Sequence, residues 1–143
     1  MIKKLLCATD GSIASDKAVD FAVQFAKQLG VELTFVTVAT VTEDSVSHTR
    51  FWNSEELKAI DEQVHRELAG AEAKAKAGGL ASYKCVAVHS PSISTGIIGF
   101  AEENGFDHIV TGSTGKTGIS RILMGSVASD VVAKAHCPVT VVR

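Results

Sequence analysis

Short apolar segments alternate along the chain with longer segments whose apolar residues recur at helical spacing. The first segment, IKKLLCAT, is closed by Asp10-Gly11-Ser12, a sequence typical of a turn followed by a helix cap. We therefore predict a buried strand that ends near Thr9. Apolar residues then recur every three or four positions from Ala18 to Leu29, and Gly30 follows as the stop of an amphipathic helix.

The rest of the chain repeats this alternation. Val31 to Val38 is rich in β-branched residues and predicts the second strand. From Ser54 an amphipathic helix runs to the stop signal Gly78-Gly79. The same criteria predict strands over 82–88, 107–112 and 137–143 and helices over 92–103 and 126–135.

This alternation predicts an α/β fold, in which a mostly parallel five-stranded sheet carries helices on both faces. Ligands of such open sheets bind beyond the carboxyl ends of the strands, where successive crossovers diverge. The glycine-containing loops after the first and fourth strands both lie at that end. The stretch 40–53 has no clear period, and its Phe51 and Trp52 would either pack on the core or cover a ligand pocket.

Length and composition limit the class of protein. A chain of 143 residues has room for one compact domain, 1–143. With 45% hydrophobic residues and a formal net charge of -2, the composition is typical of a soluble globular protein that does not attract nucleic acid generically. The amino terminus, MIKKLLCATDGS, has too short an apolar run for a signal peptide or a membrane span. We expect a cytoplasmic protein with no nucleic-acid partner and no membrane insertion.

The cysteines indicate neither a disulfide framework nor a zinc site. Cys7, Cys85 and Cys137 are odd in number, far apart and without CxxC spacing. We expect them to be small buried apolar residues.

A glycine-rich run, TGSTGKTGISRILMGS at 111–126, contains GKT and invites comparison with a nucleotide phosphate loop. A Walker A loop requires a glycine five residues before Gly115, where this chain has Val110. The run also follows the fourth strand and continues into TGIS, which is a poor helix start. A dinucleotide GxGxxG motif is missing after the first strand, where Asp10-Gly11-Ser12 stands. The run is therefore neither of these loops.

The glycine pattern that remains is Gly112-x2-Gly115-x9-Gly125-Ser126. Without a Cβ, Gly112 and Gly115 would let the main chain approach a phosphate and adopt positive φ, so that successive amides point at the anion. Gly125 and Ser126 would offer free amides at a helix amino terminus. The Ser126 hydroxyl would either cap that helix or bond a phosphate oxygen.

With this spacing the sequence resembles the universal stress protein family, in particular its ATP-binding members. The resemblance extends from LLCATDGS through DHIVTGSTG to LMGSVASDVVAKAHCPVTVVR. It implies a Rossmann-like sheet of order 3-2-1-4-5, with a nucleotide between the first and fourth strands. The ligand would be ATP, or ADP or AMP, with Mg²⁺.

The resemblance also implies roles for individual residues. Asp10 would lie near the ribose or a Mg²⁺-bridged phosphate, and the Val38 main chain would contact adenine. The phosphates would contact Gly112, Ser113, Gly115, Gly125 and Ser126, with weaker flanking contacts from Ala8, Thr9, Thr111, Thr114, Val127 and Ala128. The chain departs from many relatives after the third strand, where they have Gly-x-Pro and it has His89-Ser90-Pro91, so that an imidazole would narrow the pocket rim.

The roles of Lys116 and Arg121, and the role of Asp10, each have two interpretations. Lys116 and Arg121, inside the nine-residue spacer, would either neutralise phosphate charge or remain a solvated pair. Asp10 would cap the first helix together with Ser12, bind ligand, or do both.

Three functions follow from this interpretation. The first is an ATP-binding stress-response regulator whose occupancy changes dimer or partner contacts, with at most weak ATPase activity. The second is a slow ATP hydrolase in which Lys116 contacts the β- and γ-phosphates, and the third is a nucleotide-free scaffold. In each case we expect a homodimer through the apolar edge strand Val139 to Val142, and a protein partner that the sequence does not identify.

Overall fold

Five parallel strands form one sheet in the computed structural model, which describes residues 1–40, 54–114 and 124–143. The strands are β1 (Lys4–Ala8), β2 (Glu32–Thr40), β3 (Tyr83–Ser90), β4 (His108–Gly112) and β5 (Val139–Val142). Their order is β3-β2-β1-β4-β5, and every neighbouring pair is parallel. The order 3-2-1-4-5 implied by the family resemblance is therefore confirmed.

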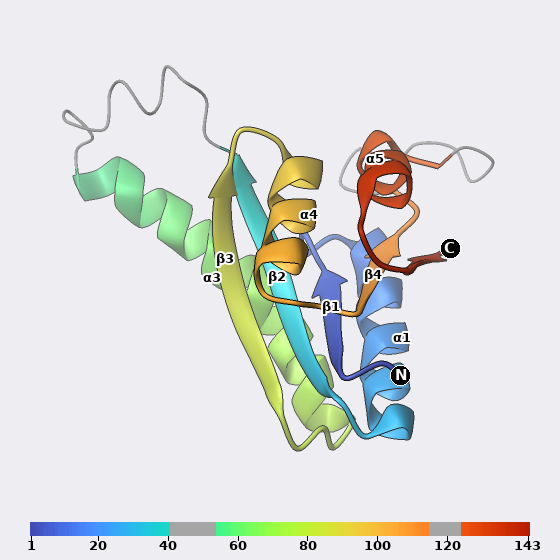
Figure 1. The fold of residues 1–143 in the computed structure, drawn as a ribbon. Coiled ribbons are helices and arrows are strands. Elements are labelled where there is room, and N and C mark those ends of the chain that lie inside the picture. The colour runs from blue at the N-terminus through green and yellow to red at the C-terminus, as the bar shows by residue number, and fades with distance from the viewer. Residues whose placement is uncertain (41–53, 115–123) are drawn as a thin grey trace.

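Helices cover both faces of the sheet, as the alternating pattern predicts. They are α1 (Ile13–Leu29), α3 (Ser54–Ala77), α4 (Ile93–Glu103) and α5 (Ser126–Lys134). Figure 1 shows α4 and α5 in front of the sheet and α1 and α3 behind it. Because neighbouring strands are parallel, the carboxyl ends of all five lie at one edge of the sheet. The arrows of β1, β2, β3 and β4 point to the top of Figure 1.

Two hydrophobic clusters, one on each side of the sheet, form the core. On the central strand, Leu5 and Cys7 belong to the cluster beneath α1 and α3, whereas Leu6 and Ala8 belong to the cluster beneath α4 and α5. Because side chains alternate between faces and both faces are covered, β1 must be apolar at its buried positions, Leu5 to Ala8. This is why KLLCA forms the centre of the sheet.

The helix and strand boundaries lie close to the predicted ones. Ser12 caps α1 by accepting a hydrogen bond from the Ser15 amide at 3.1 Å, and Gly30 ends that helix in the left-handed region at φ 67°. β2 extends two residues past Val38 because Thr40 still pairs with Ser90 of β3. Residues 41–53, with Phe51 and Trp52, lie outside the described residues.

The expectation for the cysteines is confirmed for one of the three. Cys7 is buried in the core, and burial raises the pKa of its thiol. Cys85 is exposed because it lies on β3, an edge strand of the described sheet, and Cys137 is half-buried. Within the described ranges, no helix has the length and hydropathy needed to span a bilayer.

Candidate functional site

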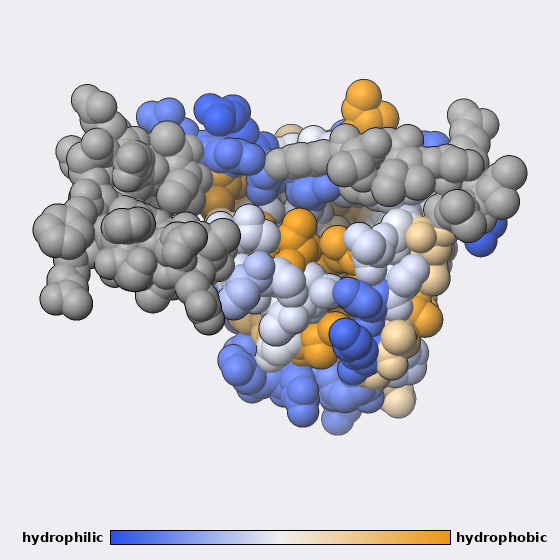
Figure 2. Space-filling model, turned by 90° about the horizontal axis from the view of Figure 1, so that it is seen from above, coloured by the Kyte–Doolittle hydropathy of each residue, from blue (hydrophilic) through white to orange (hydrophobic). Residues whose placement is uncertain are grey.

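A cavity of about 490 Å³ opens at the carboxyl ends of β1, β2 and β4. From β1 the chain builds outward to β2 and β3, and then returns to place β4 and β5 on the other side. This reversal leaves a crevice between β1 and β4 where ligands of open α/β sheets bind. The volume falls within the range of about 300–1,000 Å³ typical of small-molecule sites. Figure 2 looks down on this edge and shows apolar side chains within the hollow and more polar ones around it.

The predicted binding residues converge on this cavity. Those within the described part of the chain all line it: Ala8, Thr9, Asp10, Val38, Thr111, Gly112, Ser113, Thr114, Gly125, Ser126, Val127 and Ala128. They come from the ends of three strands and the start of α5, so the fold brings together residues more than a hundred positions apart. Gly115, Lys116 and Arg121 lie outside the described residues.

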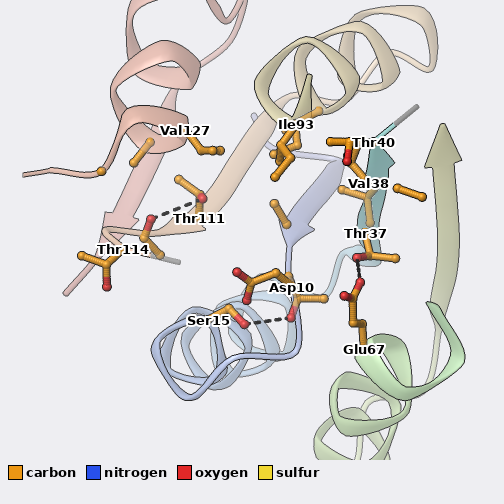
Figure 3. Close-up of a pocket in the computed structure, with 18 of the residues that line it drawn as sticks. Asp10, Ser15, Thr37, Val38, Thr40, Glu67, Ile93, Thr111, Thr114 and Val127 are labelled. Atoms are coloured by element: carbon orange, nitrogen blue, oxygen red, sulfur yellow. Dashed lines mark hydrogen bonds between the residues drawn. The ribbon is translucent and has the colours of Figure 1, made fainter. Parts of the chain in front are cut away.

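Side-chain hydrogen bonds fix the turn between β1 and α1. The buried hydroxyls of Thr9 and Ser15 lie 3.1 Å apart, and Thr9 Oγ1 also accepts from the Gly11 amide at 3.2 Å. Asp10 Oδ1 accepts from the Ser12 amide at 2.9 Å, while Ser12 itself caps the helix. The predicted participation of Asp10 in the helix start is thus indirect, through the amide of the capping residue. The turn holds Asp10 against the cavity (Figure 3).

Close main-chain packing explains two of the predicted glycines. A Cβ at Gly112 would lie 3.3 Å from the carbonyl oxygens of Ala14 and Thr114, and a Cβ at Gly125 would lie 3.1 Å from the carbonyl oxygen of Ser113. The prediction that Gly112 adopts positive φ is wrong, because this residue ends β4 in extended conformation opposite Val142. The glycine is needed for the approach of neighbouring chain segments and not for a left-handed turn.

The amino terminus of α5 faces the cavity. The first bond within this helix runs from the Ser129 amide to the Gly125 carbonyl at 2.9 Å, so the amides of Ser126, Val127 and Ala128 have no partner inside the helix. The N-cap is Gly125, which has no side chain, and the alternative that Ser126 caps the helix is therefore wrong. Amides and helix dipole together make this end of the cavity attractive to an anion.

A polar group at the opposite end of the cavity was missed by sequence reasoning. Thr37 on β2 is 2% exposed and donates a hydrogen bond to Glu67 Oε2 on α3 at 2.5 Å (Figure 3). Glu67 Oε1 accepts from Gln63 at 3.2 Å. The available signal was helical spacing, since Glu67 is three residues after Val64 and four before Ala71, on the stripe that faces inward. A carboxylate on an inward stripe indicates a specific contact.

The remaining walls of the cavity are mostly apolar and could not be assigned from local sequence. His89, expected at the rim, does line the cavity and is exposed. Further lining residues without a sequence-based assignment are Ser15, Val36, Ala39, Thr40, Gln63, Val64, Ile93 and Ile97. Most of them come from β2, α3 and α4, whose approach to the cavity depends on tertiary packing.

Comparison with known proteins gives one consistent result. A model of the universal stress protein family matches residues 1–143. Universal stress protein MJ0531 of Methanocaldococcus jannaschii is 36% identical over 148 residues, covering 100% of this chain and 83% of that protein. A solved universal stress protein in complex with cAMP has a TM-score of 0.80 at 24% identity and covers 99% of this chain and 97% of its own. Another, from Archaeoglobus fulgidus in complex with dAMP, has a TM-score of 0.67 at 22% identity, with 100% and 98% covered.

Proposed function

Since this chain belongs to the universal stress protein family, we propose that it is an ATP-binding regulatory protein of the stress response. The observation that carries the proposal is the cavity at the carboxyl ends of β1 and β4, whose two ends differ in chemistry. Main-chain amides dominate one end, and apolar side chains with a few polar groups form the rest. Such a site suits a ligand with an anionic group at one end and a flat, largely apolar group at the other.

The phosphates would bind between the end of β4 and the start of α5. Gly112 and Gly125 bring the two segments so close that the Gly125 amide donates to the Ser113 carbonyl at 2.8 Å. The free amides at the start of α5 and the exposed Ser126 hydroxyl would then donate to phosphate oxygens. Lys116 and Arg121 remain candidates for neutralising the phosphate charge.

Adenine and ribose would occupy the remainder of the cavity. The Val38 main chain would contact the base, and Val36, Ile93 and Ile97 supply apolar surface around it. Two proteins of the same fold are in complex with cAMP and dAMP, both of which carry adenine. Asp10 would bind the ribose or contribute one carboxylate oxygen to the Mg²⁺ of Mg-ATP, in keeping with the few protein ligands that Mg²⁺ takes when phosphates supply others.

A direct hydrogen bond would connect the phosphate end to the edge of the sheet. The amide of Ser113, a cavity residue, donates to the carbonyl of Val142 on β5 at 2.9 Å. β5 is an edge strand of the described sheet and its four residues are half-buried. We propose that two copies pair through Val139 to Val142, and that nucleotide at Ser113 changes the position of this strand and thereby dimer or partner contacts.

Calorimetric titration of nucleotide-free protein with ATP, with and without Mg²⁺, tests the proposal. We expect saturable binding at submillimolar ATP in the wild type. Gly125→Val should weaken it by about a hundredfold or more, because the added side chain collides with the Ser113 carbonyl and separates the amides that bind phosphate. Gly99→Ala on α4 is the matched control, because a Cβ there meets nothing within 4 Å.

The other two functions correspond to different results of the same titration. Conversion of bound ATP to ADP during the experiment, lost in Lys116→Ala, would favour the slow hydrolase. A wild-type protein that binds neither ATP nor AMP would contradict the proposal and favour the nucleotide-free scaffold.

A further inference from the structure

The cavity has a carboxylate end as well as an amide end. Gly112, Ser113 and the start of α5 line it on one side, and Thr37 and Glu67 line it on the other, with Asp10 between them (Figure 3). An ionised carboxylate only accepts hydrogen bonds. A nucleotide whose phosphates lie at the amide end must therefore direct hydrogen-bond donors, and no further anion, toward Glu67.

Hydrogen bonds from two described residues position the Glu67 carboxylate. Its two oxygens accept from Thr37 and Gln63, at 2.5 and 3.2 Å. The backbone of α3 at Glu67 also packs closely against the turn after β1, because a Cβ at Gly11 would lie 3.0 Å from the Glu67 Cα. Thr37 is 2% exposed, so the residue that donates to the carboxylate is itself buried. A carboxylate oxygen can accept more than one hydrogen bond, so the bonds from Thr37 and Gln63 do not by themselves prevent a further one from a ligand.

The contact with Gly11 indicates which part of a nucleotide Glu67 would meet. Gly11 follows Asp10 directly, so α3 brings Glu67 alongside the residue that the proposed function assigns to the ribose. In dinucleotide-binding α/β folds, a carboxylate near the carboxyl ends of the strands accepts a hydrogen bond from the ribose 2′-hydroxyl, and a nearby arginine accommodates a 2′-phosphate where one binds. We propose that Glu67 is a specificity-determining residue that accepts a hydrogen bond from one ribose hydroxyl, so that this chain binds ATP more tightly than the deoxynucleotide that lacks this hydroxyl. This inference rests on the proposed function, because it requires a nucleotide in the cavity.

A cycle of ligand and protein variants tests the proposal. Dissociation constants of ATP, 2′-deoxy-ATP and 3′-deoxy-ATP are measured for the wild type and Glu67→Ala. The wild type should bind ATP about tenfold or more tightly than one of the two deoxynucleotides, the penalty for losing a hydrogen bond to a charged group. In Glu67→Ala that preference should disappear, because the variant lacks the acceptor.

A second measurement uses the electrostatic repulsion between the Glu67 carboxylate and a phosphate group placed on a ribose hydroxyl. The wild type should bind adenosine 2′,5′-bisphosphate or its 3′,5′ isomer at least about tenfold more weakly than AMP, and the nearly isosteric Glu67→Gln should reduce that difference. Glu72→Gln is the matched control, because Glu72 is on the same helix but contacts Lys76 and Tyr83 away from the cavity.

The outcomes separate this inference from the function on which it rests. If the wild type binds ATP and both Glu67 variants keep wild-type ratios between ligands, Glu67 does not contact the ribose and the inference is wrong. Equal weakening of every ligand would also overturn it, because a purely structural role has that effect. Failure of the wild type to bind any adenine nucleotide would instead overturn the proposed function itself.

Discussion

Glycines near the cavity have two different physical roles. Gly112 and Gly125 have ordinary backbone angles and are needed because other main-chain atoms approach them closely. Gly11 has both requirements, since its φ is +74° and its missing Cβ leaves room for the Cα of Glu67. A left-handed residue with a side chain costs about 1–2 kcal/mol, so Gly11 stabilises both the turn and its contact with α3.

The free energy of unfolding should separate the cost of a side chain at positive φ from the cost of crowding against α3. Gly30 also adopts positive φ, at +67°, but a Cβ there meets nothing within 4 Å. We expect Gly30→Ala to destabilise the protein by about 1 kcal/mol through backbone strain alone. Gly11→Ala should cost about 1–3 kcal/mol more through crowding against Glu67. Chemical denaturation measures both, and equal losses would contradict the close contact between the turn and α3.

At the residue scale, the cavity residues that belong to a recognisable sequence spacing could be predicted. The cavity residues that reach the site only through tertiary packing were missed. Gly112, Gly125 and Ser126 form a pattern with a physical reason, and all three line the cavity. Ser15 and Thr37 have no such pattern, and their hydrogen-bond partners lie on other elements or a helical turn away. The only sequence signal for Glu67 was its position on the helix stripe that faces inward. The many other charged residues of that helix obscured this signal.

Among the elements, β5 is the edge strand whose outer side we propose as a dimer contact. The carbonyls of Pro138 and Val142 accept from amides of the β4 segment at 3.0 and 2.9 Å. Because alternate residues of a strand direct their main-chain groups to the same neighbour, Val139 and Val141 direct theirs to the open side of the strand. That side is where we propose that a second copy pairs.

Proline at one outward position tests this pairing selectively. Val141→Pro removes an amide that would donate to the partner strand and leaves the bonds to β4 in place. We expect the wild type to sediment as a dimer and Val141→Pro as a folded monomer that still binds ATP. A Val141→Pro protein that remains a dimer would rule out pairing along β5.

Element types were predictable because each helix and strand carries its own signals. Ser12 and Gly30 mark the ends of α1, and Gly79 and Gly105 follow α3 and α4 at φ of 72° and 67°. The end of β2 was predicted two residues short, because its last pairs depend on β3. Local sequence therefore determines helix ends better than strand ends, whose extent depends on a neighbour.

At the scale of the molecule, alternating elements predicted a sheet covered on both faces, but the order of its strands came only from the family resemblance. The sequence places both glycine-containing loops at one edge without giving the volume or shape of the space between them. The cavity of about 490 Å³ arises where β1 and β4 become neighbours, and its distant wall comes from α3 and α4. Its chemistry, with amides at one end and a carboxylate at the other, is a property of the assembled fold.

Identification of the nucleotide carried by the freshly purified protein tests the central claim most directly. The protein is denatured, the released small molecules are separated by chromatography, and the emptied and refolded protein is titrated with ATP in the presence of Mg²⁺. The account predicts an adenine nucleotide at close to one per chain, or an empty protein that takes up ATP to that ratio. A folded protein that releases no nucleotide and does not bind added ATP or AMP would contradict it.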